Sequence, residues 1–129
     1  MESIDRREHV LTKERWFGPG DRRLICDGRV VAPVVLADSY RLRRKGLLGT
    51  AGVTGAIWLT PCASVHMVGM RYPIDVAVVD ADGMVLKRAT LRPWTGLTWP
   101  ARGARATVEA AAGSMSEWGI EVGSRLSVG

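Results

Sequence analysis

The chain has 129 residues, of which 47% are hydrophobic and 24% are charged. This length suits one domain and excludes a two-domain enzyme with a separate cofactor domain, and the hydrophobic fraction excludes a disordered chain. Eighteen Lys and Arg against 13 Asp and Glu give a formal net charge of +5.

Residues 1–21 are predicted to form a charged N-terminal extension, followed by a single β-rich domain over residues 22–129. The extension alternates in charge sign and ends in Gly18-Pro19-Gly20. It has no apolar segment typical of a secretion signal. Trp16 and Phe17 could dock it onto the domain, because chain ends are usually loose unless something ties them down.

A β-hairpin is predicted over residues 22–32. Asp27-Gly28 suits its two-residue turn, in which both central residues need a positive φ. Pro33 cannot donate a hydrogen bond to a neighbouring strand, so we expect an edge or a bulge there. Asp38 and Ser39 then offer N-cap oxygens for a short helix over residues 40–48. Small residues follow and predict a loop over residues 50–55.

Short strands dominate the rest of the chain. Two segments interrupt them, a loop over residues 92–103 and one helical turn that Ser114 caps and Gly119 ends. The strands are predicted over residues 56–60, 64–67, 74–80, 84–89, 105–110 and 125–128. Turn signals at regular intervals, without a βαβ rhythm, predict a mainly β fold: a compact single-domain barrel or sandwich of about seven short strands with one or two short helices.

Several motifs resemble the bacterial and archaeal domain-of-unknown-function family 192. They are Arg44-Lys45-Gly46-Leu47-Leu48-Gly49, residues 64–80 (SVHMVGMRYPIDVAVVD), residues 108–113 and the closing Gly119-Ile120-x-x-Gly123. The resemblance runs in register from Val30 to the C-terminus. It departs from the family at Ser124, where Asp is usual, and over residues 65–69. It implies a compact β-rich domain, barrel-like or sandwich, and no established activity.

Cys62 and His66 are the first candidates for catalysis. A nucleophilic cysteine needs a nearby base, and a metal would need at least two more ligands. In a regular strand these two residues would lie on the order of 13 Å apart. Only a turn at Pro61-Cys62 would bring them together. We favour a buried cysteine and a hydrogen-bonded histidine, and we predict no metal site.

Asp75 and Glu109 are acidic residues inside apolar strands. A buried carboxylate is costly unless it is paired or hydrogen-bonded. Asp75 could be a pocket carboxylate, or it could hold backbone N–H groups or pair with Arg71, and we favour the structural role. If Asp75, Glu109 and His66 converge in one barrel mouth, they would suit general acid/base catalysis.

The excess of basic residues lies entirely within residues 1–72. Its densest run, on the predicted helix, could bind a phosphate backbone, but no nucleic-acid motif accompanies it and a solvated helix face is favoured. This run contains Arg41, Arg43, Arg44 and Lys45. Trp94 and Trp99 would anchor a ligand or partner if exposed. We expect them instead to pack as a plug in an open end of the barrel.

The pattern as a whole favours a non-catalytic ligand-binding or protein-interaction module that is soluble and cytoplasmic, with no cofactor and no membrane span. The candidate ligand-binding residues are His66, Met70, Asp75, Glu109, Trp94 and Trp99. One alternative is a small hydrolase-like enzyme that uses His66 with Asp75, Glu109 or Cys62. A second alternative is a binder of an anionic polymer through Arg41, Arg43, Arg44 and Lys45, although nucleic acid is not the expected partner.

Overall fold

The computed structural model describes residues 15–129, and this part of the chain contains nine strands and two short helices. The strands are β1 (Arg15–Phe17), β2 (Arg22–Cys26), β3 (Arg29–Ala37), β4 (Thr50–Val53), β5 (Ala56–Leu59), β6 (Ile74–Val79), β7 (Val85–Leu91), β8 (Ala106–Ala111) and β9 (Leu126–Val128). The helices are α2 (Tyr40–Lys45) and α3 (Ser114–Glu117). The predicted mainly β class is therefore confirmed. Most of the predicted extension, residues 1–14, lies outside the described residues.

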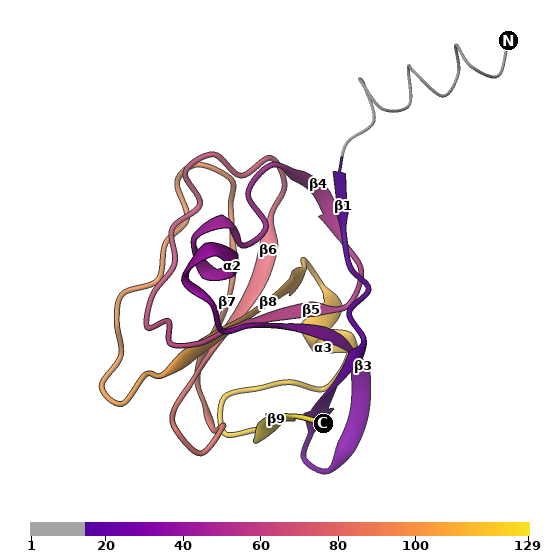
Figure 1. Cartoon of the computed structure of the whole chain (residues 1–129). Coiled ribbons are helices and arrows are strands. Elements are labelled where there is room, and N and C mark those ends of the chain that lie inside the picture. The colour runs from indigo at the N-terminus through magenta and orange to yellow at the C-terminus, as the bar shows by residue number, and fades with distance from the viewer. Residues whose placement is uncertain (1–14) are drawn as a thin grey trace, which may run out of the picture.

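Seven of these strands form one sheet that curls into a half-barrel, in the order β7-β6-β8-β5-β3-β2-β9 (Figure 1). The pair β3–β5 is parallel, and the other neighbouring strands are antiparallel. The two edge strands approach each other at one end, where Met84 and Arg125 form an isolated bridge. There the Leu126 N–H donates to the Gly83 carbonyl at 2.8 Å. The curled sheet is thus joined at one end only.

The hairpin of β2 and β3 forms as its turn residues predict. Asp27 and Gly28 have φ of 50° and 86°, the positive values that this turn requires. Strand β3 continues through Pro33, but its pairing with β5 begins only at Val34. Pro33 therefore has no partner on the β5 side, and its missing N–H costs no ladder hydrogen bond.

The loop predicted over residues 50–55 is wrong, because residues 50–53 form β4 and pair in parallel with β1. One small residue is needed there because the Trp16 ring lies close to Gly52. A Cβ added to Gly52 would lie 2.5 Å from a carbon of that ring. The Trp16 Nε1–H donates to Thr54 Oγ1 at 2.8 Å, and Phe17 packs into a hydrophobic core. Both aromatic residues thus dock the start of the described chain.

Each face of the sheet covers its own hydrophobic core. The first core includes Met115 of α3 and Leu126 of β9; its members are Leu24, Cys26, Ala32, Val34, Ala56, Ala77, Val79, Val85, Ala106, Val108, Ala110, Met115, Ile120 and Leu126. The second core is covered by β4, by the chain after α2 and by the loop after β5; its members are Ala37, Leu47, Val53, Ile57, Leu59, Met67, Met70, Ile74, Val76 and Leu91. In Figure 1, α2 and β4 lie on the opposite side of β5 from α3 and β9. All of β6 is buried as a result.

Asp75 is buried on the side of the first core, where it accepts three hydrogen bonds. Thr90 Oγ1 donates to one carboxylate oxygen at 2.6 Å, and the backbone N–H groups of Gly113 and Met115 donate to the other at 2.9 and 3.0 Å. The predicted cap by Ser114 is wrong: Ser114 is the first helical residue of α3, and the N-cap residue Gly113 makes no side-chain cap. The Asp75 carboxylate from β6 accepts from the N–H groups of Gly113 and Met115 instead, and it thereby holds α3 against the sheet.

Replacing Asp75 with Ala should lower the free energy of unfolding by about 3 kcal/mol, because it removes charge-assisted hydrogen bonds and leaves buried N–H groups without an acceptor. Asp75→Asn should cost less, since an amide oxygen can still accept from the α3 backbone. Urea denaturation measures both changes. Asp82→Ala, at an exposed turn, is the matched control and should change stability by less than about 0.5 kcal/mol. Equal stability of D75A and D82A would contradict this role.

Candidate functional site

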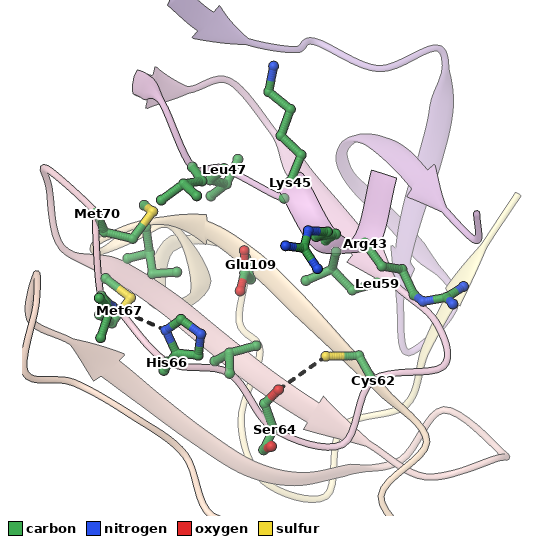
Figure 2. A pocket seen from close by; sticks show the side chains of 16 residues that line it. Arg43, Lys45, Leu47, Leu59, Cys62, Ser64, His66, Met67, Met70 and Glu109 are labelled. Carbon is green, nitrogen blue, oxygen red and sulfur yellow. Dashed lines mark hydrogen bonds between the residues drawn. The ribbon is translucent and has the colours of Figure 1, made fainter. Parts of the chain in front are cut away.

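A pocket of about 310 Å³ opens on the side of the second core (Figure 2). Three parts of the chain line it: the end of α2 with the turn after it, the loop between β5 and β6, and a floor from strands β5, β6 and β8. The lining residues are Arg43, Arg44, Lys45, Gly46, Leu47, Leu48, Leu59, Cys62, Ser64, Val65, His66, Met67, Val68, Met70, Ile74 and Glu109. The lining is mixed, with apolar side chains deep inside and basic ones on α2.

Helix α2 ends early and thereby forms one side of the pocket. The Ser39 side chain caps it as predicted, by accepting from the Leu42 N–H at 3.2 Å. Its last helical residue is Lys45, whereas the predicted end was residue 48. Gly46 follows as the C-cap residue, with a φ of 48°. Leu47 then turns into the second core. Arg43 ties the helix to the end of β5, because its Nη1 donates to the carbonyls of Asp38 and Thr60 at 2.8 and 3.2 Å.

The opposite wall is the loop over residues 62–70, where the sequence predicted a strand over residues 64–67. That prediction is wrong: His66 forms only an isolated bridge, with Leu97. The loop is held by backbone hydrogen bonds to a second loop, from the Met67 N–H to the Gly96 carbonyl at 2.9 Å and from the Thr98 N–H to the Val65 carbonyl at 2.9 Å. The pairing partner is thus an irregular segment rather than a strand of the sheet.

The predicted plug of Trp94 and Trp99 is also wrong, because their side chains are 61% and 72% exposed. Neither ring lines the pocket. The buried side chains near these loops are instead Met67, Met70 and Leu91, which belong to the second core. Met70, a predicted ligand-binding residue, does line the pocket and is buried.

Glu109 lies on the floor of the pocket and is the central side chain in Figure 2. It is 6% exposed. Within residues 15–129, no side chain or backbone group forms a hydrogen bond or ion pair with its carboxyl group. Burial raises the pKa of Glu109 from 4.5 to about 7, because the apolar surroundings disfavour the charged form. Glu109 is therefore a largely buried acid that can change charge near neutral pH, and its carboxyl oxygens are not fully enclosed.

Cys62 and His66 line the same pocket as Glu109. The Cys62 thiol donates to the Ser64 carbonyl at 3.3 Å, and burial is the largest effect that raises its pKa. It is therefore protonated at neutral pH and is not an activated nucleophile. His66 is exposed, and its Nδ1 accepts from the Val68 N–H at 3.3 Å. Cys62 and His66 lie in one irregular loop and both line the pocket, but the structure gives no hydrogen bond between them.

Asp75 does not join this group, so the convergence of Asp75, Glu109 and His66 that would suit general acid/base catalysis does not occur. The reason is the register of β6 and β8, in which Glu109 pairs with Val76 and Asp75 pairs with Ala110. Directly paired residues lie on the same side of a sheet, and neighbours along a strand lie on opposite sides. The two carboxyl groups therefore point into different cores.

Three of the four predicted anion-binding residues lie at the pocket. Arg43, Arg44 and Lys45 line it and are called here the basic rim. Arg41 is exposed and does not line the pocket. Arg44 also donates to the Tyr40 hydroxyl at 3.1 Å. Glu109 is the sole acidic residue among the lining residues, so the pocket has a basic mouth and one buried acid at its floor.

Sequence reasoning missed most of the apolar lining. Leu47, Leu59, Val65 and Ile74 reach the pocket from four different segments. Each looks like an ordinary core residue in its own segment. The resemblance drew attention to residues 44–49 and 64–80, and both stretches turn out to contribute to the pocket.

The chain was then compared with known proteins. A family model for DUF192, described as Uncharacterized ACR, matches residues 24–128. The chain belongs to the DUF192 family. No curated protein matches it. Its membership in DUF192 agrees with the resemblance seen in the sequence.

Two crystal structures resemble this DUF192 domain. One is a protein of unknown function from Novosphingobium aromaticivorans, with 23% identity over 81% of this chain and 83% of that chain and a TM-score of 0.69. The other, from Sinorhizobium meliloti, bears the name "putative transcription regulator", with 22% identity over 83% of this chain and 91% of that chain and a TM-score of 0.63. At these identities the likeness establishes the fold alone.

Over residues 15–129, His, Cys, Asp and Glu side chains nowhere gather in threes that could hold a metal ion. Among the helices of that same part of the DUF192 chain, none is long and apolar enough to cross a membrane.

The raised pKa of Glu109 predicts a pH-dependent stability. Between pH 4.5 and about 7 the folded protein holds a proton that the unfolded chain has lost, so the free energy of unfolding falls as the pH rises. Above that range the folded state carries the whole penalty of a buried charge. Glu109→Gln should remove this dependence and should be more stable than wild type at about pH 8, by up to roughly 3 kcal/mol.

Urea denaturation of both proteins at several pH values measures the difference. The two stabilities should converge toward acid pH, where Glu109 is neutral in both states, and should separate above neutrality. Stability curves that stay parallel from acid to alkaline pH would show that burial does not perturb Glu109.

Proposed function

We propose that this DUF192 domain is a non-catalytic binding module that takes a small molecule into the pocket over Glu109. The observation that carries the proposal is the carboxyl group at the floor: it is buried, it has no partner within residues 15–129, and it faces an open cavity. A polar group buried without a partner costs stability. A ligand that supplied the missing hydrogen bond would recover part of that cost.

The pocket has the composition of a small-molecule site. Such sites are mainly apolar, with a few polar groups that orient the ligand. Here the deep side chains include Leu59, Met67 and Ile74, and the polar groups are Glu109 and His66 with the basic rim at the mouth. The volume of about 310 Å³ is at the lower end for ligand sites. We therefore infer a compact ligand rather than a polymer segment.

The hydrolase-like alternative is supported by one observation. Glu109, with its pKa of about 7, shares the pocket with His66, and an acid of this kind suits general acid/base catalysis near neutral pH. We rank it second because the pocket offers no activated nucleophile: the Cys62 thiol is held protonated. Turnover of a panel of ester and amide substrates that is lost in Glu109→Gln would favour it over simple binding.

Binding of an anionic polymer through Arg41, Arg43, Arg44 and Lys45 is the other alternative. The name of the Sinorhizobium meliloti protein would fit such a role in that protein. In this chain Arg43 and Arg44 make hydrogen bonds within the domain. The three residues of the basic rim line one side of the pocket. A gel-shift titration with an anionic polymer over a range of salt concentrations distinguishes polymer binding from small-molecule binding, because binding to a phosphate backbone weakens steeply as salt rises.

The pocket should be the place where small molecules bind. We expect a library of water-soluble fragments, containing amines, carboxylates, amino acids and neutral alcohols, to shift backbone NMR signals clustered at residues 46–48 and 64–70. Val68 lines the mouth and is exposed, so Val68→Trp should be tolerated and should narrow the entrance. This variant should weaken fragment binding by about tenfold.

Val30→Trp is the matched control, because Val30 is similarly exposed on β3 and does not line the pocket. It should bind the same fragments as the wild type. Signal shifts scattered over the surface, or identical binding by V68W and wild type, would count against the pocket as the binding site.

A further inference from the structure

We propose that the ligand of this pocket is a small zwitterion whose ammonium group binds Glu109 and whose anionic group binds the basic rim, with an aliphatic spacer between them. The inference rests on the proposed function, since it assigns a chemical class to the molecule that occupies the same pocket. It follows from three features of the pocket lining: a buried carboxyl group, apolar side chains and a cluster of cations.

The floor favours a cation. The Glu109 carboxyl has no donor among the described residues, and the apolar side chains around it offer none. An ammonium group carries three donors and a positive charge. It would satisfy the carboxylate oxygens and would favour the ionised form that burial alone disfavours. A ligand hydroxyl or amide could donate a hydrogen bond but could not offset the charge.

The mouth favours an anion. Arg44 and Lys45 are exposed, and Arg43 uses its Nη1 on two backbone carbonyls, which do not neutralise its charge. In the described part of the chain, no carboxylate forms an ion pair with any member of the basic rim. A carboxylate or phosphate at the mouth would meet concentrated positive charge and guanidinium donors. Figure 2 shows Lys45 directed away from Glu109. No charge of the basic rim lowers the pKa of Glu109, so the carboxyl group and the rim are separated.

The walls between these ends favour an aliphatic spacer. Leu47, Leu59, Met67 and Met70 line the pocket and are buried. Methylene groups placed against them would leave water at about 0.8 kcal/mol each. The spacer also keeps the two ligand charges apart, as the separation of Glu109 from the basic rim requires. An aliphatic ω-amino acid has these three properties in this order.

The experiment is a calorimetric and NMR titration of the full chain with matched probes. The zwitterions γ-aminobutyrate, δ-aminovalerate and ε-aminocaproate vary the spacer, and hexylamine and hexanoate each carry one of the two charges. At about pH 8, where Glu109 is ionised, the best zwitterion should bind about tenfold more tightly than either singly charged probe. Its binding should weaken at about pH 6, where Glu109 is mostly protonated.

Other titratable groups face the same pocket, so variants must assign the pH effect. These groups are Cys62, His66, Arg43, Arg44 and Lys45, and Tyr72 is close enough for Glu109 to raise its pKa. Glu109→Gln should remove both the preference for an ammonium group and the loss of binding at acid pH. It should keep hexanoate binding, which depends on the basic rim. Lys45→Gln should weaken binding of the zwitterion and of hexanoate but not of hexylamine.

Arg41→Gln is the matched control for Lys45→Gln, because it removes the same charge from the same helix outside the pocket. Equal binding of a zwitterion and hexanoate, or zwitterion binding that Glu109→Gln leaves unchanged, would overturn the zwitterion assignment while fragment binding at the pocket still supported the proposed function. If the library fragments bind but every probe here fails, the assignment is wrong and the proposed function survives. If neither fragments nor probes shift pocket signals, both fail.

Discussion

Side-chain alternation across the paired strands β6 and β8 is the constraint on which both cores and the pocket depend. Because Glu109 pairs with Val76 while Asp75 pairs with Ala110, adjacent rows of one ladder send two carboxyl groups to opposite sides of the sheet. A shift of the register by one residue would exchange the two sides. The antiparallel pairing of β8 with β5, which sets Glu109 opposite Ile57, fixes the same orientation from the other side.

The two buried carboxyl groups meet the same desolvation cost in different ways. The desolvation cost of Asp75 is offset within the fold, since Thr90 and two N–H groups of the α3 segment donate hydrogen bonds to its carboxylate. The desolvation cost of Glu109 is not offset by any hydrogen bond within the described residues, and its pKa rises accordingly. A sequence that tolerates an uncompensated buried acid beside a fully satisfied one gives up stability at the first position, and such positions are where binding and catalysis are found.

Local signals allowed much of the fold to be predicted from the sequence. Asp27-Gly28 specifies its own turn, and the apolar run of β6 reads as a strand because both of its faces are buried. The failures share a cause: long-range contacts decide them. Residues 50–53 form a strand because they pair with β1, and residues 64–67 do not because their pairing partner is an irregular loop. The sequence of a short segment does not show whether its pairing partner will be a strand or an irregular loop.

The candidate site was predictable in its parts and not in its assembly. The sequence singled out His66, Met70, Glu109 and the basic run, and the fold brings the first three and the basic rim to one pocket. The sequence could not show that Asp75 lies on the other side of the sheet from these residues, because that depends on the register of β8 against β6. The pocket itself reflects how the two cores are covered. Helix α3 is fastened to the first core through Asp75. The second core is covered instead by β4, by the chain after α2 and by a loop without regular pairing. Irregular cover of this kind leaves space above Glu109, and this carboxyl group therefore faces an opening through which a partner from outside can reach it.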